Sequence, residues 1–583
     1  MSVEDILSGY ETLETPFYED QIGWDVMRSG ATDLESQSEF AVFNLHIACD
    51  DNNKWGTYYN SSFLRISDSE DVNLRLVTKE MIEHWQTRAK TAKHPILVAR
   101  YTDAVWDLKK IVTGENPDPE YARIAIDNNI LIAERSLHKY PVVVLDRLER
   151  ALRLAISLRD QTRISAVKNT LLSFEAKIAE DDKMGTWGRT CDLLVLELKS
   201  LTNENEKTSI LEALENRISR LLAKGENTNP WAVEAAASRI ARYYRSKNDL
   251  AKVQLALLNI EKAFDKLKQS SNPLQISGWY QHLHSIYIQF QLHEDANRIA
   301  GMLPEIGRQA RESLSAMSHT FEIPAEAIDQ HIDRITKGDL EEAIGNLVFY
   351  HKPEKEKIRQ QIVELASDFP MSFLMTKVLM DNAGITTATI GSIDSDVDGN
   401  IIFQMTQNMA FDSIILRKSI DEICKKYQVT PETLCDLIFT CPLFREDRRT
   451  LVLQGITAYM NSDFVQAIHI LVPQTEAAFR KLIELSGGNV LKPDRSGGFQ
   501  LKTLHEVLSD PIITKTFAQD FDLYFKTILT DPRGLNIRNT VSHGLVESES
   551  FNQQTADRIF HILLALSLVK KKKADNPPEG AQE

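Results

Sequence analysis

Hydrophobic residues recur at helical spacing from about residue 75 to residue 350, and polar residues, glycine and proline cluster between the hydrophobic runs. Three stretches, 145–182, 188–226 and 230–270, each predict two helices separated by a polar break, with a repeat of about forty residues. Paired helices that stack on one another bury a common core, which explains such a repeat. We therefore predict an irregular, solenoid-like array of helical hairpins over residues 76–350, after a partly irregular N-terminal extension over residues 1–75.

The helical pattern is interrupted between residues 351 and 445, which we interpret as a small connector of mixed structure. β-Branched residues lie on either side of the sequence DVDGN within residues 386–407, and this arrangement predicts a β-hairpin. Three alternate acids also resemble the start of a calcium-binding loop: Asp394, Asp396 and Asp398. Met405 occupies the twelfth position, however, where such a loop needs a bidentate acid. The sequence therefore favours a turn.

Helical spacing returns after residue 446. Six positions step by three or four and define the inward face of a long helix that ends at the sequence SGGN: Phe464, Ile468, Leu471, Thr475, Phe479 and Leu482. Three further helices are predicted from LKTLHEVLSD, PIITKTFAQDFDLYFKTILT and NQQTADRIFHILLALSLVKKKK. Residues 446–573 thus predict a compact helical bundle and residues 574–583 a disordered tail. We expect an all-α fold for the chain.

Composition restricts the class of protein. The chain has 583 residues, of which 43% are hydrophobic and 26% charged, as in ordinary folded proteins. Its first thirty residues lack the basic start and apolar run of a signal peptide. The longest apolar run near the C-terminus, residues 559–569, is shorter than the ~18 residues of a membrane span. The five cysteines show no CxxC pairing, which is typical of reduced cytosolic thiols. These features predict a cytoplasmic protein with no membrane span and no bound metal.

The net charge of −16 disfavours nucleic acid binding by the molecule as a whole. Any contact with nucleic acid therefore needs a local basic patch. Residues 531–575 supply a candidate, because seven basic side chains outnumber five acidic ones in this stretch.

The same stretch contains the sequence RGLNIRNTVSHGL, residues 533–545, which places Arg538, Asn539 and His543 within six positions. An arginine followed by a histidine five to seven positions later occurs at one other place, Arg88 and His94. There alanine follows the arginine and proline follows the histidine, so we regard that pair as coincidental. An imidazole suits general acid–base catalysis because its ordinary pKa lies near neutrality. A guanidinium presents a planar set of donors to phosphate oxygens.

The sequence RNTVSH resembles the motif of the HEPN superfamily (higher eukaryotes and prokaryotes nucleotide-binding domains). In that motif an arginine, usually followed by a polar residue, precedes a histidine with four to six residues between them. The surrounding DPRGLNIRNTVSHGL and the upstream AIHILVPQTEAAFRKLIELSGG resemble long proteins that carry a C-terminal HEPN-type domain. ARYTDAVW, residues 99–106, resembles their helical N-terminal half. Only the C-terminal part carries a motif with chemistry.

The resemblance implies a metal-independent endoribonuclease without cofactors, in which a ribose 2′-hydroxyl attacks the adjacent phosphate and leaves a 2′,3′-cyclic phosphate. In this scheme His543 moves protons, Arg538 binds the phosphate oxygens, and Asn539 orients the histidine or holds an oxygen. Arg533 would supply a second phosphate contact. Two residues four apart on the long helix are typical of an intrahelical ion pair, and we also weigh a place for them in the substrate-binding cleft: Glu476 and Arg480.

Positions 538 and 543 are five residues apart, which separates their side chains by ~140° around one helix. A single copy therefore does not place both groups on one face. HEPN domains pair about a two-fold axis and bring two such sets into one cleft. The resemblance thus implies a homodimer through the C-terminal bundle, with the composite site that an isologous interface allows.

The leading hypothesis is an enzyme that cuts RNA, with a helical N-terminal half that senses a protein or phage-derived trigger or restrains the nuclease. By analogy with HEPN nucleases, such an enzyme would serve as a toxin or an anti-phage defence effector. The alternative is a non-catalytic scaffold. Its helical array would bind protein partners, and its HEPN-like bundle would only dimerise or bind nucleotide or RNA.

Overall fold

The computed structural model describes residues 2–30, 32–47, 57–61, 77–315, 324–381, 384–494, 496–545 and 548–570. The chain forms two compact units, Met1–Leu303 (unit 1) and Pro304–Glu583 (unit 2). The fold is all-α in class, as predicted. The described residues contain three small sheets, each of two antiparallel strands.

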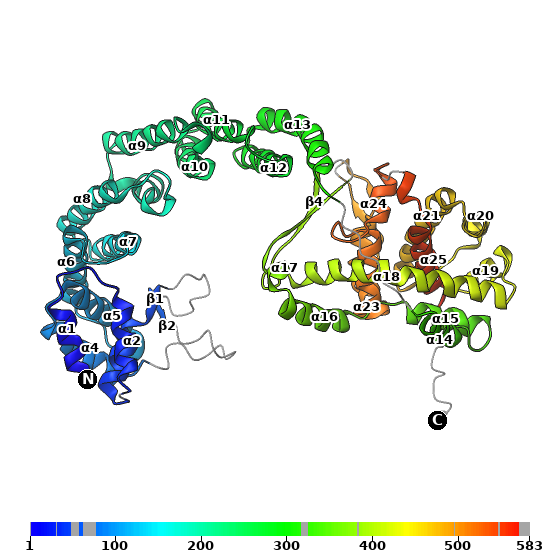
Figure 1. The fold of residues 1–583 in the computed structure, drawn as a ribbon, viewed down its shortest axis with the longest axis horizontal. Helices are drawn as coiled ribbons and strands as arrows, with labels where there is room; N and C mark the ends of the chain where they lie inside the picture. The colour runs from blue at the N-terminus through cyan, green and yellow to red at the C-terminus, as the bar shows by residue number, and fades with distance from the viewer. Residues whose placement is uncertain are drawn as a thin grey trace, which may run out of the picture. The chain divides into compact units, whose positions relative to one another are not determined.

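Unit 1 consists of successive helices, most of them joined by short loops (Figure 1). Its α-helices are α1 (Val3–Glu11), α2 (Glu19–Arg28), α3 (Leu34–Phe43), α4 (Lys79–Thr91), α5 (Pro95–Thr113), α6 (Pro119–Arg135), α7 (Pro141–Ser157), α8 (Gln161–Ile178), α9 (Glu204–Leu222), α10 (Pro230–Ser246), α11 (Leu250–Leu267) and α12 (Pro273–Gln289). A π-helix (Cys191–Glu197) precedes α9, and α13 (His293–Glu312) crosses the boundary at residue 303. Strands β1 (Leu45–Ile47) and β2 (Tyr59–Ser61) pair between α3 and α4.

Consecutive helices of unit 1 pack against each other, α5 with α6, α6 with α7, α7 with α8 and α10 with α11. On α7, Leu145, Leu148 and Leu152 form one buried stripe because they recur every three or four residues. The three stretches predicted as helical pairs correspond to α7 with α8, the π-helix with α9, and α10 with α11. The prediction of helical hairpins is therefore confirmed.

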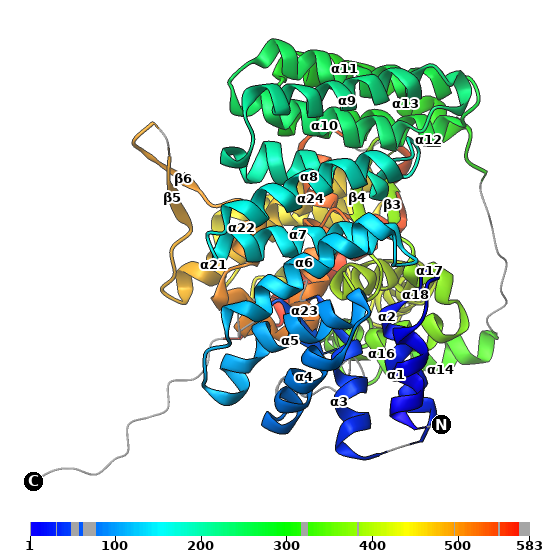
Figure 2. The same ribbon diagram turned by 90° about the vertical axis from the view of Figure 1, so that its left-hand side faces the viewer.

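Unit 2 combines helices with two of the small sheets (Figures 1 and 2). Its elements are α14 (Ala325–Ile335), α15 (Leu340–Tyr350), α16 (Lys355–Asp368), α17 (Pro370–Leu374), β3 (Lys377–Met380), β4 (Thr386–Ile390), α18 (Val397–Lys426), α19 (Pro431–Ile438), α20 (Arg449–Met460), α21 (Phe464–Leu485), β5 (Leu491–Pro493), β6 (Phe499–Leu501), α22 (Leu504–Leu508), α23 (Pro511–Leu529), α24 (Ile537–Ser542) and α25 (Gln553–Ser567). The strands pair as β3 with β4 and β5 with β6.

A hydrophobic core runs through unit 2 from Ile335 to Leu566. Helix α18 takes a large part in it, since it packs against α14, α15, α16, α23 and α25. The predicted connector, 351–445, therefore shares one core with the predicted bundle, 446–573, and the boundary predicted at residue 350 falls at residue 303. Periodicity misplaced this boundary because it reports the buried face of a helix but not the helix that covers that face.

The long helix predicted after residue 464 is α21, and its predicted inward face is confirmed. Phe464 at its start is partly buried, and the other positions of the stripe are fully buried: Ile468, Leu471, Thr475, Phe479 and Leu482. Through this face α21 packs against α20, α23 and α25. The helix thereby places the polar side chains on its flank at a fixed position beside α24.

The β-hairpin predicted within residues 386–407 is displaced toward the N-terminus. Its first half is β4, which pairs with the upstream strand β3 rather than with a downstream strand. Residues from Val397 onward form α18, and Asp396 caps this helix by accepting a hydrogen bond from Gly399 N at 2.8 Å. The acid-rich sequence is therefore a helix start rather than a hairpin turn. The described residues contain no group of three or more side chains suited to a metal ion.

The β5–β6 hairpin lies between α21 and α22 in the sequence, and it extends away from the helices of unit 2 (Figure 2). Of the predicted N-terminal extension, α1 to α3 are helical and pack within unit 1. No described helix combines the length and the apolar character needed to cross a membrane. The predicted disordered tail, 574–583, lies outside the described residues.

Candidate functional site

The RNTVSH sequence covers the last five residues of the six-residue helix α24 and His543, which directly follows it. The loop before α24 packs tightly on α23: a Cβ added to Gly534 would lie 2.2 Å from the carbonyl oxygen of Thr527. Asn536, the residue just before α24, adopts a left-handed backbone conformation with a φ of 51°, which asparagine tolerates better than most residues. Glycine and asparagine at these two positions therefore fix where α24 begins and how it is directed.

Arg538 reaches from α24 to α21, where it pairs with Glu476. Its Nε donates a hydrogen bond to Glu476 Oε2 at 2.9 Å, and its Nη2 donates to Oε1 at 3.4 Å. Arg480, four residues further along α21, also donates to Oε1 through its Nη2. The same Nη2 donates to the carbonyl oxygen of Lys502 at 3.1 Å. We call Glu476, Arg480 and Arg538 the arginine–glutamate cluster. Because two guanidiniums flank one carboxylate, the cluster carries one excess positive charge.

The sequence predicts the Glu476–Arg480 pair from the spacing of four residues, but not the link to Arg538. That link joins positions 62 residues apart, and helical periodicity carries no information on such a contact. The side chain of Glu476 is 11% exposed. An acid in this position pairs with the arginines and would repel a phosphate, so the geometry does not favour the predicted contact of Glu476 with a substrate.

Asn539 braces the start of α24 beside Arg538. Its Nδ2 donates to Asn536 Oδ1 at 2.8 Å and to the carbonyl oxygen of Thr530 at 3.4 Å. Its Oδ1 accepts a hydrogen bond from Arg538 Nη1 at 3.3 Å. The side-chain amide is thus engaged with the loop and with Arg538, and not with the imidazole of His543.

His543 directly follows the last residue of α24, and its side chain is exposed. Its backbone N–H donates to the carbonyl oxygen of Asn539 at 3.0 Å. Within the described part of the chain, its imidazole forms no hydrogen bond or ion pair. One copy therefore presents an arginine held in a cluster and a histidine whose ring is open to solvent.

Arg533 lies outside the arginine–glutamate cluster. Its Nη2 pairs with Asp531 Oδ2 at 3.0 Å and its Nε with Oδ1 at 3.1 Å, while its Nη1 lies 3.5 Å from Asp396 Oδ1. The hydrogen bonds to Asp531 raise the pKa of Arg533. Two carboxylates therefore neutralise this guanidinium, and a phosphate would have to displace them to reach it.

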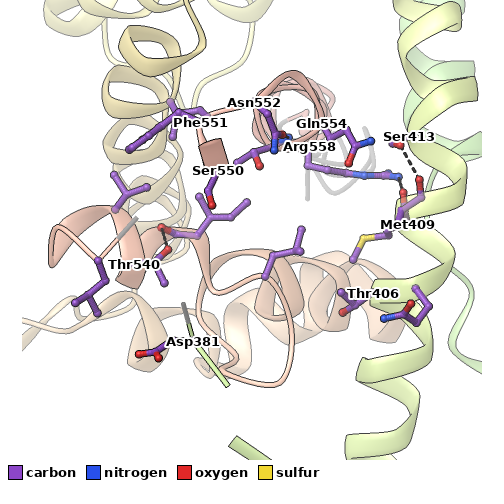
Figure 3. A pocket seen from close by; sticks show the side chains of 18 residues that line it. Asp381, Thr406, Met409, Ser413, Thr540, Ser550, Phe551, Asn552, Gln554 and Arg558 are labelled. Atoms are coloured by element: carbon purple, nitrogen blue, oxygen red, sulfur yellow. Dashed lines mark hydrogen bonds between the residues drawn. The ribbon is translucent and has the colours of Figure 1, made fainter. Parts of the chain in front are cut away.

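A cavity of about 440 Å³ borders α24, between α18, α25 and the residues that precede α25 (Figure 3). Three residues of α24 line it: Ile537, Thr540 and Val541. Arg558 also lines it, but its guanidinium is used within the protein, since Nη2 donates to the carbonyl oxygen of Met409 at 2.7 Å and to Asp412 Oδ2 at 2.9 Å. The sequence analysis identified neither the cavity nor Arg558. An arginine directly before the apolar run of α25 was the available signal.

Two other histidines of unit 2 are buried near Arg558. His351 Nδ1 bonds to Asp412 Oδ1 at 2.9 Å, and His561 Nδ1 bonds to the Tyr524 hydroxyl at 2.8 Å. Burial, together with the charge of Arg558, lowers the pKa of His561 to about 3. Both imidazoles are buried and have no access to a bound substrate, so these two histidines belong to the packing of the unit.

Comparisons with known proteins concern other parts of the chain or the fold alone. A family model for a domain of unknown function (DUF7380) matches residues 77–167, within unit 1. No curated protein matches the chain. Among solved structures, a circular tandem repeat protein with novel repeat topology and enhanced subunit contact surfaces is similar over 84% of this chain and 95% of its own. It shares 11% sequence identity, with a TM-score of 0.22. The family match does not include the arginine–glutamate cluster.

Proposed function

We propose that unit 2 is a metal-independent endoribonuclease of HEPN type. The observation that carries the proposal is the arrangement at α24, where Arg538 belongs to a cluster with one excess positive charge and the open imidazole of His543 follows five residues later. A guanidinium in a cluster with excess positive charge binds phosphate oxygens, and an accessible imidazole transfers protons near neutral pH. The cluster gives RNA a local positive site on a chain whose net charge is −16.

The reaction needs only these groups and the RNA. An imidazole removes the proton of a ribose 2′-hydroxyl, and the 2′-oxygen attacks the adjacent phosphorus. The bond from phosphorus to the 5′-oxygen of the next nucleotide breaks, and a protonated imidazole gives that oxygen a proton. The products are a 2′,3′-cyclic phosphate and a 5′-hydroxyl. Arg538 stabilises the charge on the phosphate oxygens in the transition state.

The proposal includes a homodimer through unit 2. Arg538 faces Glu476 while the side chain of His543 is exposed, so one copy supplies the two groups in different directions. A two-fold axis beside α24 would bring a second set to the same groove, because an isologous interface places each group twice. One His543 would then act as the base and the other as the acid.

Unit 1 takes the role of sensor or restraint in this proposal. Its helical hairpins form the kind of array that binds protein partners along an extended surface. We assign the trigger, a protein or a phage-derived component, to this unit and place the whole enzyme in the cytoplasm as a toxin or defence effector.

The experiment is an RNA-cleavage assay on the full-length protein in the presence of EDTA. We expect the wild type to cut single-stranded RNA and to leave 2′,3′-cyclic phosphate ends, which mass spectrometry of the fragments identifies. The variant His543→Ala should show no cleavage. His505→Ala is the matched control, because His505 is an exposed histidine on α22 in the same unit, and this variant should cut as the wild type does. A requirement for added metal, or cleavage by His543→Ala, would count against the enzyme.

A non-catalytic scaffold is the second candidate, and one observation favours it. The Glu476–Arg538 pair is also what a purely structural contact between two helices looks like. For a scaffold, expression of the wild type and of the double variant Arg538→Ala/His543→Ala would be equally harmless to cells. A toxic wild type with a harmless double variant supports the nuclease instead.

A further inference from the structure

Arg538 uses only part of its guanidinium in the arginine–glutamate cluster. A guanidinium has five N–H groups in one plane. The Nε–H and one N–H of Nη2 point to the two oxygens of Glu476, and one N–H of Nη1 points to Asn539 Oδ1. One N–H on Nη1 and one on Nη2 have no partner among the described residues, and the contact with Glu476 leaves the Nη1–Nη2 end of the guanidinium unused by this carboxylate. This end is the edge that binds two oxygens of a phosphate at once.

Glu476 is itself held in place from two sides. It lies on α21 between the buried Thr475 and Phe479, and its side chain is 11% exposed. The Nη2 of Arg480 donates to Oε1 of Glu476 and to the carbonyl oxygen of Lys502, which follows β6. The carboxylate therefore has a defined position from which it fixes the plane of the Arg538 guanidinium.

A long arginine side chain on a six-residue helix would otherwise sample many rotamers, and ordering it costs conformational entropy. A catalytic group must be held within about 0.5 Å of its productive place, and neighbouring hydrogen bonds supply that restraint. The two-point contact with Glu476 does so for Arg538 without occupying its phosphate-binding end.

We infer that Glu476 is a positioning residue for the cleavage reaction: it holds Arg538 through the Nε–Nη2 edge so that the Nη1–Nη2 end faces the scissile phosphate. Arg480 supports it by neutralising the carboxylate, which would otherwise repel the substrate. Glu476 thus acts through Arg538 and does not contact the RNA. It has this role only if unit 2 is the nuclease proposed above, and the experiment separates the two statements.

The test compares Glu476→Gln with Glu484→Gln in steady-state cleavage of a single-stranded RNA oligonucleotide by the full-length protein. Glutamine keeps the size of the side chain but removes the charge and one of the two acceptors. We expect kcat to fall by about 10- to 100-fold, as for other losses of orientation at a reacting group, with little change in KM. Glu484 lies on the same helix, is 46% exposed and pairs with Lys481, so Glu484→Gln should cut like the wild type.

A second measurement shows whether the effect passes through Arg538. When Arg538 is already alanine, Glu476→Gln should lower kcat no further, because there is no guanidinium left to position. A merely structural Glu476 would reduce activity in both backgrounds by the same factor. Circular dichroism and the unfolding midpoint of each variant show that the losses do not arise from unfolding.

The outcomes point to different conclusions. If the wild type cuts RNA and Glu476→Gln cuts equally fast, Glu476 does not position Arg538, while the proposed nuclease stands. Faster cleavage by Glu476→Gln would overturn the inference as well, because the carboxylate would then be an inhibitor of the site. If the wild type cuts no RNA, the proposed function fails, and the positioning role fails with it.

Discussion

A carboxylate between two arginines occurs in both units, but in different surroundings. In unit 1, Glu19 on α2 forms an ion pair with Arg147 on α7, and its Oε1 lies 3.7 Å from Nη1 of Arg100 on α5. The side chains of Arg100 and Arg147 are 5% and 9% exposed. In the arginine–glutamate cluster of unit 2, the two arginine side chains are 19% and 23% exposed. The arginines are therefore buried in unit 1 and border solvent in unit 2, while the two carboxylates are similarly buried.

The remaining hydrogen bonds show what each arrangement does. In unit 1, Arg100 Nε donates to the carbonyl oxygen of Val42 at 2.7 Å, and Arg147 Nη1 donates to Asn129 Oδ1 at 3.2 Å. These arginines join helices and the end of α3 from inside the unit. In unit 2, both arginines are partly exposed, and an exposed histidine directly follows α24. Burial, rather than the type of residues, distinguishes a structural ion cluster from a candidate site.

The largest effect that separates the two clusters is expected from Glu19→Ala. This change leaves two buried guanidiniums without their carboxylate, and removing one partner from a buried ion cluster costs about 3 to 5 kcal/mol of unfolding free energy. All seven tryptophans of the chain lie in unit 1, so tryptophan fluorescence during urea unfolding follows this unit alone. Asp20→Ala, at the exposed neighbouring position, should leave the transition almost unchanged. Equal transitions for the two variants would show that the buried cluster does not stabilise unit 1.

The sequence predicted those parts of the fold that depend on local patterns. The stripe on α21 and the paired helices of unit 1 follow from spacing alone, and both are present. The hairpin was misplaced because an aspartate such as Asp396 occurs both in turns and at helix starts. In the structure Asp396 caps α18, and β4 pairs with the earlier strand β3 rather than with a later strand. The boundary of unit 2 was misplaced because helices far apart in sequence share its core.

In the candidate site, too, local patterns were predictable from the sequence and long-range contacts were not. Arg538, Asn539 and His543 were identified from a short motif, and Glu476 and Arg480 from a spacing of four residues. Arg538 joins Glu476 and Arg480 because the loop before α24 packs closely on α23, with Gly534 against Thr527, and brings Arg538 within reach of α21. A sequence pattern does not report such a long-range approach, so the link between the motif and the Glu476–Arg480 pair was visible only in the structure.

A buried histidine of unit 2 provides a second test of how burial affects stability, with a smaller expected effect. His561 is buried beside Arg558, His351, Asp412 and Tyr524, and its pKa is lowered to about 3. The unfolded chain binds a proton at this imidazole below the ordinary pKa of about 6.5, whereas the folded chain does not. Stability is therefore lost as the pH falls from about 6.5 toward 3, by at most about 1.4 kcal/mol per pH unit.

The variant His561→Gln should remove this part of the pH dependence. Between pH 7 and pH 5.5, we expect the wild type to lose about 1 kcal/mol more unfolding free energy than the variant does. Amide hydrogen exchange of α25 at the two pH values measures the difference within unit 2. His543→Gln is the exposed control and should keep the pH dependence of the wild type. An unchanged pH dependence in His561→Gln would show that this imidazole is already protonated in the folded chain.

The smallest effect on stability is expected at the arginine–glutamate cluster itself. Arg538→Ala removes two hydrogen bonds to Glu476, but Arg480 still neutralises that carboxylate and α24 lies at the surface. Partly exposed ion pairs contribute below about 1 kcal/mol, so hydrogen exchange of α21 should change little. The same variant should lose most of the cleavage activity proposed for unit 2. If Arg538→Ala instead lost several kcal/mol of unfolding free energy, the cluster of unit 2 would be a structural one like the cluster of unit 1. Arg538 would then have a packing role, as Arg147 has.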